Sequence, residues 1–331
     1  MDGLTIALGC PGGQTYPTGV RSPLDLPVGV TGADAVRLFG AAYRMLGSAC
    51  GAGEVVRDVL REATGTFPED GTLGGGAVGD PYRRLVAEVF AAALRRGEPV
   101  RPRREPHTVA WLPEPVLTAG GTLGPLDTPE RREAVSMARL VLLERLAPGE
   151  RAAAVVHEMF DYGPAEAATV LGLPEARYVT LERRARHRLQ EAETPPRTPE
   201  GEEQRWSAVA ELLRAIKEED AVALEELLAD DVVAWSDGGG EPGVVRRPVL
   251  GTAKVGRFLA AVRERIRDGV RGHIAEVNGD AALIAAAGAE VVGVLAPEFG
   301  VQGMVGIRAV ADPARLVFVS RQWAELGGSA G

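Results

Sequence analysis

The chain has 331 residues, of which 45% are hydrophobic and 25% charged, so it can form two or three domains with cores of their own. Disorder is therefore not the default expectation. The most apolar later run, residues 281–297, is interrupted by Glu290 and shorter than the roughly 20 residues that a membrane span needs. The formal net charge is -9, so binding to nucleic acid would have to depend on a local basic patch.

The first 32 residues and the two cysteines bear on the cellular location of the protein. MDGLTIALGC is an apolar run that ends in Cys10, but it lacks the positive segment and the length of a secretory signal. Cys10 and Cys50 lie in unrelated contexts and form neither a disulfide framework nor a metal-ligand set. We therefore expect residues 1–32 to be an irregular extension of a cytoplasmic protein that has no metal and no cofactor.

Residues 33–105 are predicted to form a helical domain. Two stretches, residues 38–63 and 82–96, have apolar residues at helical spacing. The glycine-rich stretch between them, residues 64–80, indicates a loop in which Phe67 is the only aromatic residue. The basic segment at the end of the domain either follows the phosphates of a nucleic acid or is an ordinary solvated helix end. Its arginines are Arg95, Arg96, Arg101, Arg103 and Arg104.

Residues 106–126 are predicted to be an extended, proline-rich linker. They begin with HTVAWLPEPVL, whose prolines forbid a regular helix or a central strand. Trp111 and Leu112 are the side chains of this linker that we expect to dock on another part of the molecule.

Residues 127–192 are predicted to form a second helical domain that ends in a helix-turn-helix. Asp127 or Thr128 is the expected N-cap of its first helix, directly before a proline. In the later stretch PAEAATVLGLPEARYVTLERRARHRL, Pro164 occupies a first-turn position, Gly172 provides the turn, and Pro174 begins the second helix.

The second helix of this motif is strongly basic, with five arginines and a single glutamate, Glu182, in residues 176–189. The residues expected to face inward are Ala176, Val179, Leu181 and Ala185. The side chains expected to project from the other sides are Arg177, Tyr178, Thr180, Arg183, Arg184, Arg186, His187 and Arg188. Because arginine pairs bidentately with guanine edges and phosphate oxygens, the pattern predicts a DNA recognition helix. The alternative is a solvated helix face, but one glutamate cannot neutralise five arginines from within the run.

After a linker at residues 193–204, residues 205–331 are predicted to form an α+β domain. RWSAVAELLRAIKEE and AVALEELLADD predict two helices, VVAWSDGGG a strand, and TAKVGRFLAAVRERI a third helix. Several strands are expected between residues 273 and 318. This order fits a cone that is built on a curved sheet.

The two helical domains resemble those of a known family of transcription factors. Residues 142–189 closely resemble region 4 of the extracytoplasmic-function sigma factors, in the sigma-70 superfamily, where a four-helix domain reads the minus-35 promoter element. FGAAYRMLGS resembles the beginning of region 2, which binds the polymerase clamp and captures melted DNA in that family. The resemblance is weaker after this stretch, because Gly51 and Gly53 stand where the family usually has an acidic cluster. Only Glu54 and Asp58 remain of that cluster. Region 2 is therefore degenerate.

The linker and the C-terminal domain resemble one subgroup of these sigma factors. WLPEP is similar to the subgroup's linker, and the C-terminal segments look like its additional SnoaL-like domain. The subgroup's DGGGK motif has a counterpart in residues 236–240, but Glu241 replaces the lysine, and SRQWAEL stands where the closing Asn-Pro-Asp-Lys-Leu motif is expected. The resemblance implies a multidomain fold class: all-α regions 2 and 4 plus an α+β SnoaL-like cone.

The resemblance also implies partners and site residues. Promoter DNA and RNA polymerase core are the implied partners of a sigma-factor-like transcription regulator, which the cone regulates in cis. Polymerase contacts are implied at Tyr43, Arg44, Glu54 and Asp58. Contacts between domains are implied at Trp111, Leu112, Pro113, Asp237, Gly238, Gly239 and Gly240.

Two other functions stay open at this point. SnoaL-like enzymes use an acidic residue or a histidine in the mouth of the cone as general acid or base, and Asp237 and His273 are the candidates here. Asp237 is more simply the cap of a glycine turn. The chain is then either a non-initiating, sigma-derived protein whose cone binds or converts a small molecule, or a DNA-binding regulator that does not melt promoters.

Overall fold

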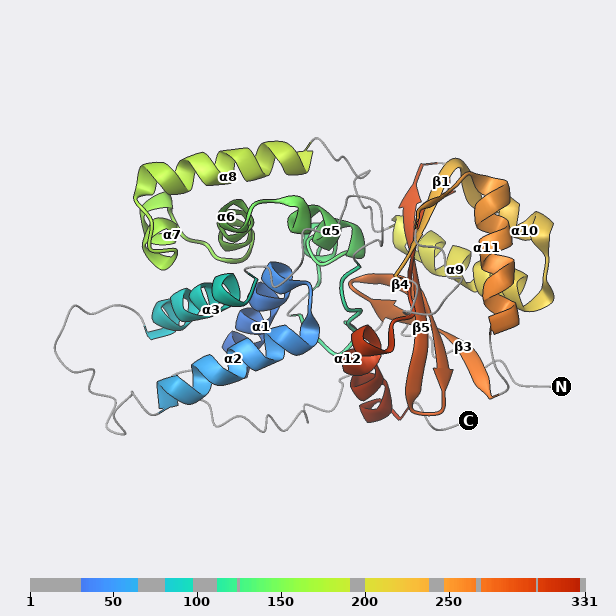
Figure 1. The fold of residues 1–331 in the computed structure, drawn as a ribbon, viewed down its shortest axis with the longest axis horizontal. Helices are drawn as coiled ribbons and strands as arrows, with labels where there is room; N and C mark the ends of the chain where they lie inside the picture. The colour runs from blue at the N-terminus through green and yellow to red at the C-terminus, as the bar shows by residue number, and fades with distance from the viewer. Residues whose placement is uncertain are drawn as a thin grey trace.

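The computed structural model describes residues 31–64, 81–97, 112–123, 126–190, 200–237, 247–265, 269–301 and 303–327. They form a helical lobe (residues 31–190) and a sheet lobe (residues 200–327), which lie side by side in Figure 1. The predicted fold class, helical domains followed by an α+β domain, is confirmed. The N-terminal extension up to residue 30, the glycine-rich loop from residue 65 to 80 with Phe67, and the arginines at 101, 103 and 104 lie outside the described residues.

Helices α1 (Gly32–Leu46), α2 (Ala49–Thr64) and α3 (Pro81–Gly97) form the first half of the helical lobe. A capping box begins α1: the backbone N–H of Asp34 donates to Thr31 Oγ1, and the backbone N–H of Thr31 donates to the Asp34 carboxylate. The helix ends at Gly47, whose φ of 61° is left-handed and lets the chain turn into α2.

Helices α4 (Pro129–Glu133), α5 (Met137–Arg145), α6 (Pro148–Met159), α7 (Pro164–Val170) and α8 (Glu175–Gln190) form the second half. Thr128 caps α4, because its hydroxyl accepts from the backbone N–H of Arg131. Both halves share one apolar core, in which the rings of Phe90 and Phe160 meet edge to face with centroids 6.2 Å apart.

The sheet lobe contains one six-stranded sheet in the order β2-β1-β6-β5-β4-β3. Its strands are β1 (Leu228–Ser236), β2 (Val249–Leu250), β3 (Val270–Val277), β4 (Asp280–Ala287), β5 (Glu290–Gly300) and β6 (Gly303–Val310). All neighbouring pairs are antiparallel except β1 and β6, which are parallel.

Helices cover both faces of this sheet (Figure 1). On one face, α9 (Glu200–Glu218), α10 (Ala221–Glu226) and α11 (Thr252–Arg265) enclose an apolar core in which Val232 and Leu259 are fully buried. On the other face, α12 (Pro313–Glu325) packs with Leu112 and Leu117 of the linker in a separate core. The second face therefore connects the sheet lobe to the helical lobe.

The prediction of strands up to residue 318 was wrong at its end, because residues 313–318 belong to α12. The Asp312 carboxylate accepts from the backbone N–H of Ala314, and Pro313 occupies the first helical turn, where its missing N–H is not needed. These two residues start a helix in spite of the β-branched residues that follow. Within the described ranges, no helix combines the length and the hydropathy needed to cross a bilayer.

Candidate DNA interface and the junction between the lobes

The predicted helix-turn-helix is formed by α7 and α8. Gly172 adopts a φ of 65°, and the backbone N–H of Leu173 donates to the carbonyl of Ala168 at 2.9 Å, which closes the end of α7. The chain then enters α8 directly after Pro174. The turn predicted at Gly172 is therefore confirmed.

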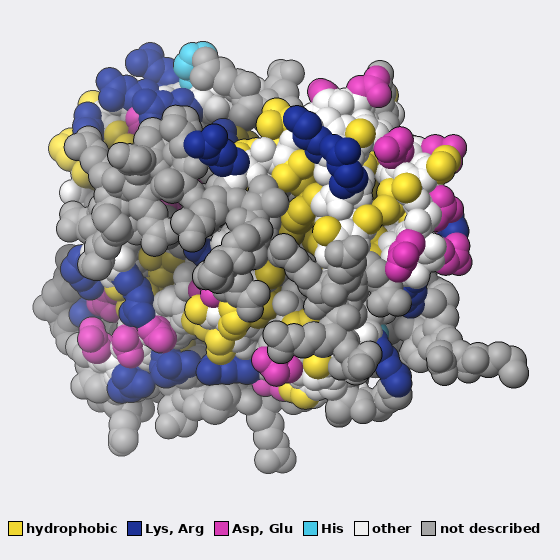
Figure 2. Space-filling view, turned by 45° about the vertical axis from the view of Figure 1, so that its right-hand side comes forward, with side chains coloured by type: hydrophobic (Ala, Val, Ile, Leu, Met, Phe, Trp, Pro, Cys, Tyr) yellow, Lys and Arg dark blue, Asp and Glu magenta, His cyan; other side chains and the backbone are white. Residues whose placement is uncertain are grey.

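Three arginines of α8 project into solvent: Arg177, Arg183 and Arg184 are all exposed. Within the described part of the chain, no carboxylate lies within ion-pair distance of any of them. In Figure 2, Lys and Arg side chains gather at the upper left, over the end of the molecule where Figure 1 places α8. Exposed guanidinium groups on a helix can bind phosphate oxygens or base edges.

The other two arginines of α8 are paired with carboxylates. Arg186 forms an ion pair with Glu182 one turn before it, and Arg188 lies 2.6 Å from a carboxylate oxygen of Glu150 in α6. Glu150 is only 4% exposed, so Arg188 compensates a carboxylate that is largely withdrawn from water. Neutralisation of the basic run comes partly from another helix, which the sequence of α8 alone does not reveal.

Three of the orientations predicted for α8 were wrong. Tyr178 is 3% exposed and packs in the helical core, whereas Val179 is 44% exposed and Ala176 is exposed as well. The inward stripe has spacings of three and four and consists of Tyr178, Leu181, Ala185 and Leu189. Burial raises the pKa of the Tyr178 phenol, which does not face solvent as a DNA contact would require.

The remaining predicted DNA contacts differ in how available they are. His187 is exposed near the end of α8. Thr180 is half-buried, and its hydroxyl donates to the carbonyl of Ala176 one turn earlier at 2.8 Å. That hydroxyl still has lone pairs to offer, but its proton is already used within the helix.

The predicted polymerase contacts separate into buried and exposed pairs. Tyr43 is fully buried and Arg44 is 6% exposed, so neither presents its side chain on the surface. Burial raises the pKa of Tyr43 and lowers the pKa of Arg44 to about 10. Glu54 and Asp58 are exposed on α2, where Glu54 pairs with an arginine of α3 and Asp58 lies 3.0 Å from Arg61. The Tyr43 hydroxyl donates to the carbonyl of Glu114, and Arg44 Nε donates to the carbonyl of Ala134 at 3.2 Å, so both side chains hold distant segments of the chain together.

Asn278 occupies the point where three segments of the chain meet. It lies in the tight turn between β3 and β4, with a φ of 52°, and is 1% exposed. Its amide Nδ2 donates to the Tyr43 hydroxyl and to the carbonyl of Val135, both at 2.9 Å, and its Oδ1 accepts from the backbone N–H of Val116 at 3.0 Å. We call Tyr43, Val116, Val135 and Asn278 the junction.

The linker continues from the junction along the sheet lobe. Leu117 pairs with Val277 like a short antiparallel strand, and its backbone N–H and carbonyl both bind the side-chain amide of Gln322 in α12, at 2.9 and 3.0 Å. The Thr118 hydroxyl donates to Glu276 at 2.7 Å. These contacts fix the linker mainly by its backbone, so they do not depend on its proline side chains.

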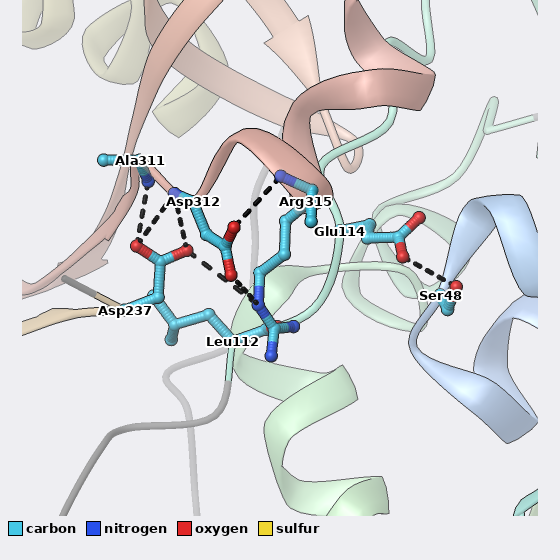
Figure 3. Close-up of polar contacts among 8 residues, drawn as sticks. Ser48, Leu112, Glu114, Asp237, Ala311, Asp312 and Arg315 are labelled. Atoms are coloured by element: carbon cyan, nitrogen blue, oxygen red, sulfur yellow. Dashed lines mark hydrogen bonds and ion pairs between the residues drawn. The ribbon is translucent and has the colours of Figure 1, made fainter. Parts of the chain in front are cut away.

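The predicted contacts between domains at Leu112 and Asp237 are connected through Arg315 (Figure 3). The Asp237 carboxylate accepts from the backbone N–H groups of Ala311 at 2.9 Å and Asp312 at 3.2 Å, just before α12 begins. Arg315 Nε lies 4.0 Å from Asp237, and its Nη1 donates to the carbonyl of Leu112, which is fully buried. Asp237 therefore caps the turn that leads into α12, while the glycine turn that follows it lies outside the described residues.

Glu114 ties the same linker to the helical lobe. Its carboxylate accepts from the Ser48 hydroxyl at 2.7 Å and from the backbone N–H of Cys50 at 3.0 Å, at the start of α2 (Figure 3). Pro113 beside it is buried. Of the remaining predicted contacts between domains, Trp111, Gly238, Gly239 and Gly240 lie outside the described residues.

The two candidate catalytic residues are not brought together. Asp237 follows β1 and His273 lies in β3, four strand steps away in the sheet order, or roughly 19 Å at the usual strand spacing. Burial, with Lys217 and Arg271 nearby, lowers the pKa of His273, whose ring lies 4.9 Å from that of Trp323.

The residues that join the lobes were mostly missed from the sequence, and Asn278 and Gln322 are the main examples. The pair Asn278-Gly279 is a strong signal for a tight hairpin turn, which these two residues do form. That signal predicts the turn but not the partners of the asparagine side chain.

Comparison with known proteins agrees with this architecture. No family model matches the sequence. The chain is 31% identical over 276 residues to the ECF RNA polymerase sigma factor SigJ of Mycobacterium tuberculosis, a match that spans 83% of this chain and 81% of that protein. It is 28% identical over 168 residues to the sigma factor SigG of the same organism, over 46% of this chain and 45% of SigG. The crystal structure of SigJ superposes with a TM-score of 0.62 at 24% identity, covering 86% of this chain and 97% of that one. The chain belongs to the extracytoplasmic-function sigma factor family, as a transcription regulator that carries an additional C-terminal sheet domain.

Proposed function

We propose that this sigma factor binds promoter DNA through the exposed arginines of α8 and acts with RNA polymerase core, while the sheet lobe controls the helical lobe in cis. The observation that supports DNA binding is the set Arg177, Arg183 and Arg184, which are exposed on one helix of a helix-turn-helix and have no ion-pair partner in the described part of the chain. Arg186 and Arg188 are already engaged by carboxylates.

A charge-matched pair of variants tests the interface in the full chain. DNA sites are first selected from a randomised duplex pool with the wild-type protein, and affinity is then measured by fluorescence anisotropy over a range of salt concentrations. Arg183→Ala/Arg184→Ala should weaken binding at least tenfold and reduce the log-log salt slope by about 0.9 for each phosphate that the variant no longer neutralises. Arg247→Ala/Arg257→Ala, which removes two exposed arginines of the sheet lobe, should change neither quantity. Equal behaviour of the α8 variant and the wild type would contradict the proposal.

Control in cis is supported by the junction, where one side chain of the sheet lobe contacts α1, the linker and the turn between α4 and α5. A sheet lobe attached in this way holds the two halves of the helical lobe in one arrangement. Because both halves of the helical lobe resemble parts that sigma factors use on polymerase and promoter, this arrangement should affect initiation.

Pull-down on RNA polymerase core and run-off transcription, each with the full chain and with a chain lacking residues 205–331, test this part of the proposal. We expect core binding by the full chain and a change in promoter-dependent transcript when the sheet lobe is absent. Core binding with no change in transcription would remove the regulatory role, and failure to bind core would remove the role in initiation.

A further inference from the structure

A cavity of about 390 Å³ lies between the two lobes, next to the junction. Its walls come from three parts of the chain: the segment from α4 to α5 (Glu133 and Ala138), the beginning of α9 (Arg205) and the sheet from the β3–β4 turn through β5 (Asn278 and Phe299). This volume falls within the usual range of small-molecule sites. An apolar cavity of roughly 150 Å³ is already enough for benzene, so this one has room for a substituted aromatic molecule.

The cavity differs from the interior of the cone, where a ligand was expected from the sequence. The face of the sheet under α9, α10 and α11 is filled by side chains such as Val232, Leu259 and Ile307, which are fully buried. The space between the lobes lies partly on the opposite face, where Ala296 belongs to the core that contains the linker.

The walls are chemically biased towards a positive guest. Among the described residues that line the cavity, Glu133, Asp280 and Glu298 supply carboxylates and Arg205 supplies a guanidinium. Arg205 is engaged with Asp280, at 3.3 Å, and Glu298 pairs with Arg308, which is held over the ring of Trp235. With Arg308 counted, these described side chains carry one net negative charge, so a cation meets more favourable charge than an anion does.

The uncharged part of the wall is mixed: Phe299 and Met137 and Ala138 of α5 supply apolar surface, beside the polar side chains of Ser136, Gln204 and Asn278. An aromatic ring at the wall can pack against an apolar body or lie against a cation. We propose that this cavity binds a small organic cation, an amine or quaternary ammonium that carries an aromatic or aliphatic body, and that such a ligand locks the two lobes together.

Ligand binding should depend on contact between the lobes, because both lobes contribute residues to the cavity wall. Glu133 and Ala138 belong to the helical lobe, while Asn278 and Glu298 belong to the sheet lobe. The complete site exists only while the lobes are in contact, so a ligand that binds it shifts the population towards the closed arrangement in proportion to its differential affinity. Asn278 is shared by the cavity and the junction, which places the ligand beside the contact that it would stabilise.

The binding test uses the full chain and three probes that share a phenyl-alkyl body but differ in charge: 2-phenylethylammonium, 2-phenylethanol and 3-phenylpropanoate. Isothermal calorimetry and ligand-observed NMR should rank the affinity of the cation first and that of the anion last. Glu133→Gln should lower the affinity for the cation by about fivefold and leave the affinity for the alcohol unchanged, because one favourable charge is removed. Glu130→Gln, an exposed carboxylate of the same short helix, is the matched control and should change nothing.

A second, independent test fills the cavity with a bulky side chain. Ala138→Phe should abolish binding of the cation, whereas Ala253→Phe on an exposed position of α11 should not. The coupling is measured by amide hydrogen exchange: the probe cation should slow exchange of the Val116 and Asn278 amides, which are both bonded across the junction. Equal affinity for all three probes, or binding that survives both Glu133→Gln and Ala138→Phe, would contradict the proposal that this cavity binds an organic cation. Binding without slower exchange at these amides would contradict the proposal that the ligand holds the two lobes together.

Discussion

At the scale of single residues, Asn278 connects more of the chain than any local pattern around it suggests. Its side chain satisfies the buried backbone groups of Val116 and Val135 and the hydroxyl of Tyr43. Asn278→Ala would leave these groups without that partner and place alanine at a left-handed φ, so we expect it to lower the free energy of unfolding by about 2–4 kcal/mol. Urea titration measures this decrease.

The comparison variant Asn278→Gly separates the two causes, because glycine adopts the φ of 52° without strain. It should recover about 1 kcal/mol of the decrease and keep the rest, which belongs to the hydrogen bonds. If alanine and glycine both behave like the wild type within about 0.5 kcal/mol, the side chain of Asn278 does not hold the lobes.

His273 should make the stability of the sheet lobe decrease at mildly acidic pH. Burial, with Lys217 and Arg271 nearby, lowers its folded pKa, so the unfolded chain takes up the proton first as the pH falls below about 6.5. Stability that is present above that pH is therefore lost as the pH falls towards the lower folded pKa. His273→Phe keeps a ring against Trp323 and should lose less unfolding free energy than the wild type between about pH 7.5 and pH 5.5. An identical decrease in both proteins would show that other groups cause the dependence.

At the scale of elements, the turn between α7 and α8 sets the direction of the basic helix. Gly172 has a φ of 65°, and a Cβ added there would meet no atom within 4 Å. Only backbone strain then opposes substitution, so Gly172→Ala should cost about 1 kcal/mol and Gly172→Asn clearly less, because asparagine tolerates the left-handed region. Thermal unfolding of the two variants provides the measurement. Equal destabilisation by alanine and asparagine would point to a cause other than φ.

The elements differ in how far the sequence could predict them, and the reason is the range of the contacts that define them. The helix-turn-helix depends on local signals, Pro164 and Gly172, and these predicted it correctly. The end of the sheet domain was mistaken because the valines of α12 favour strands locally, while the Asp312 cap and the packing of the helix on β5 decide its form. The partners of Asn278 lie 143, 162 and 235 residues away, beyond the reach of any local pattern.

At the scale of the whole molecule, directional hydrogen bonds from a few side chains join the two lobes beside an apolar core that contains Leu112, Leu117 and Met137. Asn278 binds the linker and α1, and Gln322 binds the linker from α12. Each of these hydrogen bonds is directional and breaks when the lobes separate by even a few ångström. Such an attachment is specific when closed and can be released by the removal of a few groups, which suits a lobe that controls its neighbour.

The double variant Asn278→Gly/Gln322→Ala removes two of these side chains without adding bulk or strain. We expect the lobes to separate in a measurable fraction of molecules, so that the radius of gyration from small-angle X-ray scattering rises by a few ångström above that of the wild type, near ~20 Å if compact. Glu325→Ala, at an exposed position of α12, is the matched control and should leave the scattering unchanged. Far-ultraviolet circular dichroism should be the same in all three proteins, because the helices and strands keep their own cores. A double variant that stays as compact as the wild type would mean that the apolar contacts of Leu112, Leu117 and Met137 suffice to hold the lobes, and that the sheet lobe is a fixed part of the fold rather than a releasable one.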